Sequence, residues 1–256
     1  MPYAIAGGER IFYAFHRSSL PDAPHLILIH GAGGNHQHWG GAVRKLRAAN
    51  VYALDLPGHG RSGGSGLTSI TDYASRVRQF LDALGIERAF LAGHSMGGAI
   101  AMQASLSYPE RVSGLILVGS GARLRVLRAI LDGMLSDPAA TIELICATAY
   151  SAWTPRELVR QGQLQMLKVA PQTIHDDFAA CNAFDVMDRL QEMRFPTLVV
   201  CGTEDRLTPV KYSMFLQEKI VGAELKLIEG SGHMVMTEKP EALAEALESV
   251  LAKWKH

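Results

Sequence analysis

The feature that most constrains this chain is a series of short apolar runs separated by segments with helical periodicity. The runs occupy residues 26–29, 51–54, 89–92, 115–118, 198–200 and 225–228. They do not alternate apolar with polar residues, which is typical of strands covered on both faces in a parallel sheet. Helical patterns lie between them, at residues 39–46, 70–84, 96–106, 210–220 and 240–251. Strand followed by helix, repeated along the chain, predicts a doubly wound α/β sheet.

The N-terminal part adds two more strands to this expectation. Apolar and aromatic residues at 3–6 and 11–16 flank a Gly-Gly-Glu-Arg turn, which predicts a β-hairpin. With 256 residues and 48% hydrophobic content, the chain can bury one large core. We therefore expect a single catalytic domain.

The alternation of strand and helix is interrupted between residues 121 and 194. Helical stretches follow one another there with no convincing strand, at residues 129–135, 141–149 and 155–169. We expect a core made of residues 1–120 and 195–256, with residues 121–194 inserted as a helical cap.

Charge and cysteine content exclude several classes of partner. The 25 basic and 25 acidic residues cancel, so no cationic surface for nucleic acid is expected. The three cysteines, Cys146, Cys181 and Cys201, show no C-x-x-C spacing and fit reduced thiols in a cytoplasm. The first residues lack the basic start and apolar run of a secretory signal, and no apolar run approaches the roughly 20 residues of a membrane span. We expect a cytoplasmic protein that does not enter a membrane.

The pattern G-x-S-x-G occurs twice, and its surroundings differ. Ser95 follows the apolar run 89–92 and precedes a helical pattern, whereas Ser62 lies in a glycine-rich loop with neither neighbour. A nucleophile elbow needs a strand-to-helix reversal with small residues on both sides of an exposed serine. Its helix also directs an N-terminus, which favours developing negative charge, at the reacting centre. Ser95 is the predicted nucleophile, and Ser62 is expected to be a solvated turn serine.

Three motifs now give a specific resemblance. GHSMGG at 93–98 resembles the nucleophile elbow of the α/β-hydrolase superfamily, HGAGG at 30–34 resembles its oxyanion loop, and DLPGHGRS at 55–62 resembles the loop after its fourth strand. The resemblance covers nearly the whole chain. It implies an eight-stranded, mostly parallel sheet with a helical cap, a Ser-Asp-His triad, and no cofactor.

The resemblance also points to a base and an acid. His233 lies in Gly-Ser-Gly-His after the run 225–228 and before the final helix, which is the superfamily's histidine position. The acid follows the sixth or the seventh strand in this superfamily. No carboxylate follows residue 118 closely, whereas Asp205 lies in a matching loop after residue 200. Glu204 is the fallback, and Asp205 could instead be a turn residue or helix cap.

The oxyanion of an attacked carbonyl needs prepositioned donors. The superfamily position gives the backbone N–H groups of Met96 and Ala32, with Gly33 as the alternative second donor. The glycines let this loop pass closely by the substrate, which makes Gly31 and Gly33 candidate contacts. His94 is expected to pack near the site.

Further candidates for substrate contact are less specific. Arg123, with Arg125 and Arg128, could clamp a substrate carboxylate, although a solvated helix face is the favoured interpretation. Trp153 and Met234 are candidate pocket residues, as are Tyr150, Met134 and Met166, which ordinary packing would explain equally well.

Other histidines are not expected to do chemistry. His30, His36 and His38 lie close together in sequence, but no acidic or cysteine partner lies nearby, so we predict no metal site. His59 and Asp55 are expected to brace their loop.

The predicted function is hydrolysis of a small carboxylic ester through an acyl-enzyme on Ser95, with His233 as base and then acid. Lactonases, thioesterases, carbon-carbon bond hydrolases and cofactor-free haloperoxidases share this triad and stay open as alternatives. Epoxide hydrolases and haloalkane dehalogenases are disfavoured because they carry an aspartate at the position of Ser95. A non-enzymatic ligand receptor on the same fold is the alternative from another class.

Overall fold

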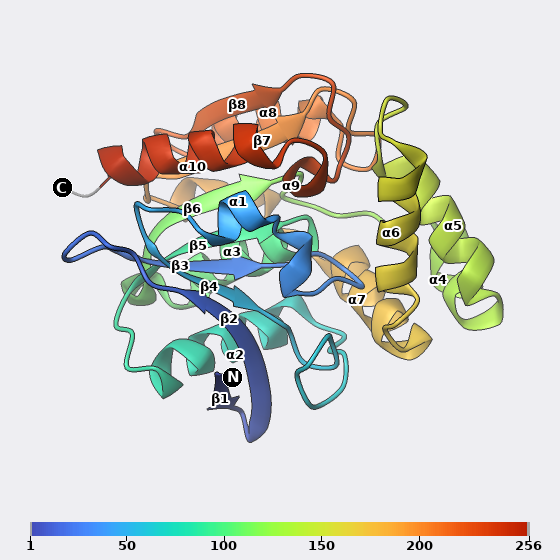
Figure 1. Cartoon of the computed structure of the whole chain (residues 1–256), viewed down its shortest axis with the longest axis horizontal. Helices are drawn as coiled ribbons and strands as arrows, with labels where there is room; N and C mark the ends of the chain where they lie inside the picture. Colours follow the sequence, from blue (N-terminus) through green and yellow to red (C-terminus); the bar gives the residue numbers. More distant parts are fainter. Residues whose placement is uncertain (1, 255–256) are drawn as a thin grey trace.

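The computed structural model describes residues 2–254, and it contains one eight-stranded sheet (Figure 1). The spatial order is β1-β2-β4-β3-β5-β6-β7-β8. The strands are β1 (Tyr3–Ala6), β2 (Glu9–His16), β3 (His25–Ile29), β4 (Asn50–Leu54), β5 (Ala89–His94), β6 (Val112–Val118), β7 (Thr197–Gly202) and β8 (Glu224–Ile228). β2 pairs antiparallel with β1 and β4, and every other pairing is parallel. The predicted mostly parallel α/β sheet is confirmed.

Helices cover both faces of the sheet, which explains the continuous apolar runs. One face packs on α2 (Ile70–Ala83), α3 (Met96–Ser107) and α8 (Val210–Lys219). The other packs on α1 (Gly41–Arg44) and α10 (Pro240–Lys253), and the short α9 (Val235–Glu238) adds to that side. In β3, Ile27 and Ile29 belong to the first core cluster while Leu26 and Leu28 belong to the second. Both side-chain directions of the strand are therefore buried.

Two local expectations differ from the structure. β8 is not covered on both faces: Leu227 is 42% exposed, because this strand lies at the edge of the sheet where fewer helices reach it. The helix expected at 39–46 is only the four-residue α1, preceded by a 3-10 turn at His36–His38. Gly40 separates the two, and a Cβ there would lie 2.9 Å from the Met236 carbonyl oxygen, so the backbone passes close to α9 rather than continuing as a helix.

Residues 121–194 form helices between β6 and β7, and these gather beside one end of the sheet (Figure 1). They are α4 (Arg128–Ser136), α5 (Pro138–Ala149), α6 (Arg156–Met166) and α7 (Pro171–Ala183), followed by a 3-10 turn at Met187–Glu192. We call this segment the helical insertion. Its ends meet in a single antiparallel bridge between Arg123 and Asp185. The predicted limits of the core at residues 1 and 256 lie outside the described residues.

The sequence pattern did not predict α7. Its buried positions recur at helical spacing, but two of them, Thr173 and Asp177, are polar. Helices are predicted from apolar residues at helical spacing, and this pattern is missing where some of the buried positions are polar.

Across residues 2–254, the helices are all too short or too polar to cross a bilayer.

Candidate active site

The turn from β5 into α3 holds Ser95 in a strained backbone conformation. Its φ of 53° and ψ of −116° make it, with Asp22, one of two non-glycine residues at positive φ in the described part of the chain. Such strain persists where surrounding contacts impose it. A Cβ on Gly93 would lie 2.0 Å from the Gly97 oxygen, and one on Gly97 would lie 2.1 Å from the Ile29 oxygen. The elbow therefore requires glycine at both positions.

Hydrogen bonds to β6 and the residues after it fix the backbone of Ser95, the predicted nucleophile. The Ser95 N–H donates to the Val118 carbonyl at 2.9 Å, and the Ser95 carbonyl accepts from the Ser120 hydroxyl at 2.8 Å. The serine side chain stays partly exposed at the start of α3. This arrangement presents a hydroxyl at a helix N-terminus, where negative charge is favoured.

The loops after β7 and β8 bring Asp205 and His233 together. His233 Nδ1 lies 2.9 Å from Asp205 Oδ2, and both residues are buried. Since the carboxylate accepts, the proton sits on Nδ1, which leaves Nε2 of a neutral His233 as a proton acceptor. Glu204 points elsewhere, because its carboxylate accepts from Trp153 Nε1 at 2.9 Å.

Asp205 is kept ionised although it is buried. Its Oδ1 accepts the N–H groups of Leu207 and Thr208 at 2.9 and 2.8 Å, and its Oδ2 accepts the Thr208 hydroxyl at 2.8 Å. Burial alone would raise the pKa of Asp205, but the charge and hydrogen bond of His233 and the bonds from Thr208 hold that pKa below its usual value. The pair can thus stabilise an imidazolium when His233 takes up a proton.

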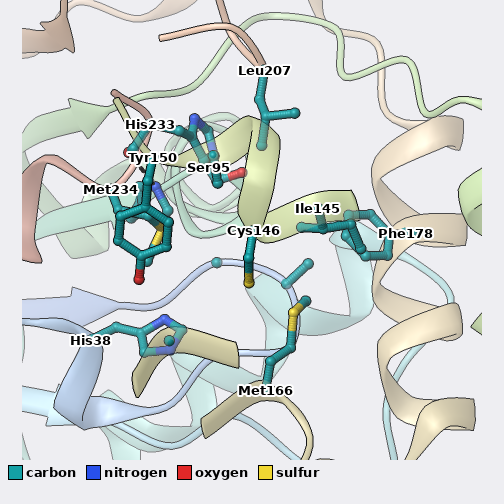
Figure 2. Close-up of a pocket in the computed structure, with 15 residues that line it drawn as sticks. His38, Ser95, Ile145, Cys146, Tyr150, Met166, Phe178, Leu207, His233 and Met234 are labelled. Atoms are coloured by element: carbon teal, nitrogen blue, oxygen red, sulfur yellow. Dashed lines mark hydrogen bonds between the residues drawn. The ribbon is translucent and has the colours of Figure 1, made fainter. Parts of the chain in front are cut away.

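Ser95 and His233 line a cavity of about 70 Å³ (Figure 2). Gly31, Ala32, His94 and Met234 line it from the sheet side. The helical insertion and nearby loops supply the remaining wall, made of His38, Ile145, Cys146, Ala149, Tyr150, Gly162, Met166, Phe178 and Leu207. The lining contains no lysine or arginine from residues 2–254. The space next to the predicted nucleophile is therefore small, mostly apolar and free of fixed positive charge.

The oxyanion loop presents Ala32 to the cavity and turns Gly33 away. The Gly33 N–H donates to Asp177 Oδ2 at 2.8 Å, so it is already engaged. The Gly31 carbonyl accepts from His30 Nδ1 at 2.8 Å and from the Gly34 N–H at 3.1 Å. Of the two alternatives for the second donor, the Ala32 N–H is the one this geometry leaves for a substrate.

His94 lines the cavity and supports His233. The two rings lie 4.6 Å apart between centroids, and His94 Nε2 lies 3.0 Å from the His233 carbonyl, to which it donates. Burial, together with the nearby His233, lowers the pKa of His94 well below its usual value. His94 is therefore a neutral packing partner.

Several residues predicted near the substrate lie outside the cavity. Arg123 faces Asp185 at 3.7 Å, Arg128 faces Asp132 at 3.2 Å with its side chain 91% exposed, and Trp153 is 79% exposed. Met134 is buried in the core without lining the cavity. Tyr150 and Met166 do line it.

The three clustered histidines make different contacts. His30 Nε2 accepts the Leu56 N–H at 3.0 Å, and His36 Nδ1 lies 2.8 Å from Asp55 Oδ1. His38 faces the cavity, where burial lowers its pKa to about 4. Within residues 2–254, no group of three potential metal ligands converges.

Sequence reasoning missed the cavity residues Ile145, Phe178 and Leu207 and the buried Asp177. No motif marks them, because their positions depend on how the insertion packs. The sequence pattern raises His38 only as a candidate metal ligand, whereas the structure places it in the cavity wall.

Comparisons with known proteins agree with this fold. Residues 26–246 match the model of the alpha/beta hydrolase family. The chain is 32% identical to the putative carbamate hydrolase RutD of Azorhizobium caulinodans, over 96% of this chain and 97% of that protein. It is also 32% identical to the 2-hydroxy-6-oxononadienedioate/2-hydroxy-6-oxononatrienedioate hydrolase of Paraburkholderia phymatum, over 89% of this chain and 87% of that protein. A solved structure of a thermophilic esterase shares 33% identity with a TM-score of 0.87, covering 99% of this chain and 98% of the other.

The chain belongs to the alpha/beta hydrolase family. The relatives compared above are named for hydrolytic reactions, which makes this protein a hydrolytic enzyme of that family.

Proposed function

We propose that this protein is a serine hydrolase that cleaves small, uncharged carboxylic esters through an acyl-enzyme on Ser95. The observation that carries the proposal is the convergence of a strained Ser95 and an Asp205-anchored His233 on one small apolar cavity. The similarity to a thermophilic esterase supports the same substrate class.

The chemistry follows from the placement of these groups. His233 Nε2 takes the proton from the Ser95 hydroxyl as its oxygen attacks the ester carbonyl. The backbone N–H groups of Ala32 and Met96 then donate hydrogen bonds to the oxyanion of the tetrahedral intermediate. His233 gives its proton to the departing alkoxide. Water attacks the acyl-enzyme by the same steps and releases the acid.

The cavity lining favours an uncharged substrate. The Paraburkholderia relative is named for a dicarboxylate substrate, whose carboxylates would need cationic partners once removed from water. Because no arginine or lysine lines this cavity in the described chain, a carboxylate close to the scissile bond would lose its hydration without compensation. Carbon-carbon cleavage of such dienoates is therefore disfavoured.

Carbamate hydrolysis is the second candidate, because the putative carbamate hydrolase is similar over nearly the full length of both chains. A carbamate carbonyl would pass through the same acyl-enzyme steps. Lactones and thioesters would as well, so a panel of leaving groups on one short acyl chain has to separate them.

The deciding experiment measures multiple turnover of nitrophenyl esters of increasing acyl length by the parent protein and by Ser95→Ala and Ser62→Ala. Loss of the nucleophile should lower kcat by about 10⁶-fold. Ser62→Ala is the matched control from the second G-x-S-x-G copy and should stay active. A Ser95→Ala variant that still turns over esters would refute the proposal, and a parent that binds esters without multiple turnover would favour the receptor alternative.

A further inference from the structure

Asp177 of α7 is a buried carboxylate that contacts three other parts of the chain. Its side chain is fully buried. Oδ2 accepts the Gly33 N–H and faces His59 Nε2, each at 2.8 Å, and Oδ1 accepts the Tyr73 hydroxyl at 2.5 Å. The helical insertion thereby touches the oxyanion loop, the 55–62 loop and α2 through a single side chain.

The partner of Asp177 is a charged histidine. His59 Nδ1 lies 2.9 Å from the Pro57 carbonyl, which can only accept, and Nε2 faces the carboxylate. Both ring nitrogens must therefore donate, which requires the imidazolium. Burial alone would lower the pKa of His59, but the charge and hydrogen bond of Asp177 raise it above its usual value. The chain retains a buried ion pair although burying two charges is costly.

The contact with Gly33 fixes the loop that carries the predicted donor. In a trans peptide, N–H and C=O point in opposite directions. The Gly31 carbonyl is held by His30 and Gly34, so the Ala32 N–H of the same peptide points the other way. The next peptide carries the Gly33 N–H, which Asp177 holds. The two consecutive peptides around Ala32 are thus fixed from opposite sides, one from the core and one from the insertion.

We propose that Asp177, with His59 as its charge partner, is a positioning residue that holds the Ala32 N–H in place for the oxyanion. This inference rests on the proposed function. It makes the helical insertion part of the catalytic apparatus through one buried contact, in addition to its role as a cavity wall.

The test compares Asp177→Ala and the isosteric Asp177→Asn with Asp176→Asn. Asp176 is the matched control, because it lies next to Asp177 on α7 and its hydrogen bonds within residues 2–254 go to His175 and Gln172 of the same helix. Circular dichroism and thermal melts identify the folded variants. If the alanine variant does not fold, the asparagine variant, which keeps the size and one acceptor oxygen, decides.

Two measurements distinguish a positioning role of Asp177 in catalysis from a purely structural role. Kinetics on a short nitrophenyl ester should show kcat lower by about 10- to 10²-fold with KM nearly unchanged, since a displaced donor weakens only transition-state binding. The inhibition constant of a boronic acid, which forms a tetrahedral adduct with the nucleophilic serine, should rise by a similar factor. Binding of the carboxylic acid product should change little, and Asp176→Asn should match the parent.

The outcomes distinguish this inference from the proposed function. If the parent protein neither turns over esters nor binds the boronic acid, the proposed function itself is refuted. An active parent whose folded Asp177 variants keep kcat and boronic acid affinity would overturn only the positioning role. A rise in KM at constant kcat would do the same, because it would indicate loss of ground-state binding.

Discussion

Two of the three buried histidine-aspartate pairs within residues 2–254 have nearly equal geometry and lie in different regions of the molecule. His233 and Asp205 meet at 2.9 Å at the ends of β7 and β8, and His59 and Asp177 meet at 2.8 Å between the 55–62 loop and the helical insertion. In the first pair Nδ1 faces Asp205, and Nε2 is the nitrogen that the proposed function uses for proton transfer with Ser95. In the second both nitrogens face acceptors. The free nitrogen, rather than the pair itself, distinguishes a general base from a fixed charge.

Breaking the first pair should have the largest catalytic effect. Asp205→Asn keeps the shape of the side chain but removes the charge that holds His233 in its working tautomer, and kcat should fall by about 10⁴-fold. Steady-state kinetics on a nitrophenyl ester would measure this loss. Glu204→Gln is the control, because the Glu204 carboxylate contacts Trp153 and not His233. The reverse ranking of the two variants would transfer the role of acid to Glu204.

His59→Gln breaks the second pair and should lower the free energy of unfolding by about 3–5 kcal/mol, because it leaves Asp177 buried without its countercharge. The folded pKa of His59 is raised, so its contribution is full below the unfolded value of about 6.5 and is lost as pH rises through the folded value. Denaturant unfolding of parent and variant across pH should show a difference that narrows toward alkaline pH. A difference that widens there would contradict the imidazolium assignment.

Denaturant unfolding across pH should also distinguish the two pairs at acidic pH. The folded pKa of Asp205 is lowered, so its contribution is present above an unfolded value of about 3.9 and is lost as pH falls through the folded value. The stability difference between parent and Asp205→Asn should therefore shrink in acid, in the opposite direction to that of the His59 variant.

A smaller effect is expected at Ser62, which anchors the loop that carries His59. The Ser62 hydroxyl accepts the Phe12 N–H at 2.8 Å and donates to the Asp55 carbonyl at 2.6 Å. The prediction of a solvated turn serine is therefore wrong, because this hydroxyl is hydrogen-bonded to two backbone groups. Ser62→Ala should lower the free energy of unfolding by about 1–3 kcal/mol because two backbone groups lose their partner. Urea unfolding would measure this change, and a kcat far below that of the parent would show that the loop does more than brace.

The smallest effect is expected at Arg123, which faces Asp185 and lies outside the cavity. Arg123→Glu should leave unchanged the ratio of kcat/KM values for two matched esters, one neutral and one carrying a free carboxylate. If the variant instead loses kcat/KM for the carboxylate ester more than for the neutral ester, Arg123 binds the substrate carboxylate.

Much of the fold and of the candidate site is local in origin, and the sequence by itself determined those parts. The apolar runs 26–29 and 115–118 predict buried parallel strands because no polar residue interrupts them. The pattern around Ser95 is local as well, since a tight strand-to-helix turn requires small residues beside the serine, and a Cβ on Gly93 would clash with the Gly97 oxygen of the same turn. His233 and Asp205 could be predicted from the loops in which they lie.

Only the tertiary structure decided which side chains surround that site. It placed Phe178 and Leu207 at the cavity, left Trp153 in solvent, and engaged the Gly33 N–H so that Ala32 remains as the predicted donor. The physical reason is the sequence separation of the partners. Asp177 meets His59 across 118 positions and Gly33 across 144, and whether a carboxylate is buried or solvated depends on such distant groups and not on its neighbours in the chain.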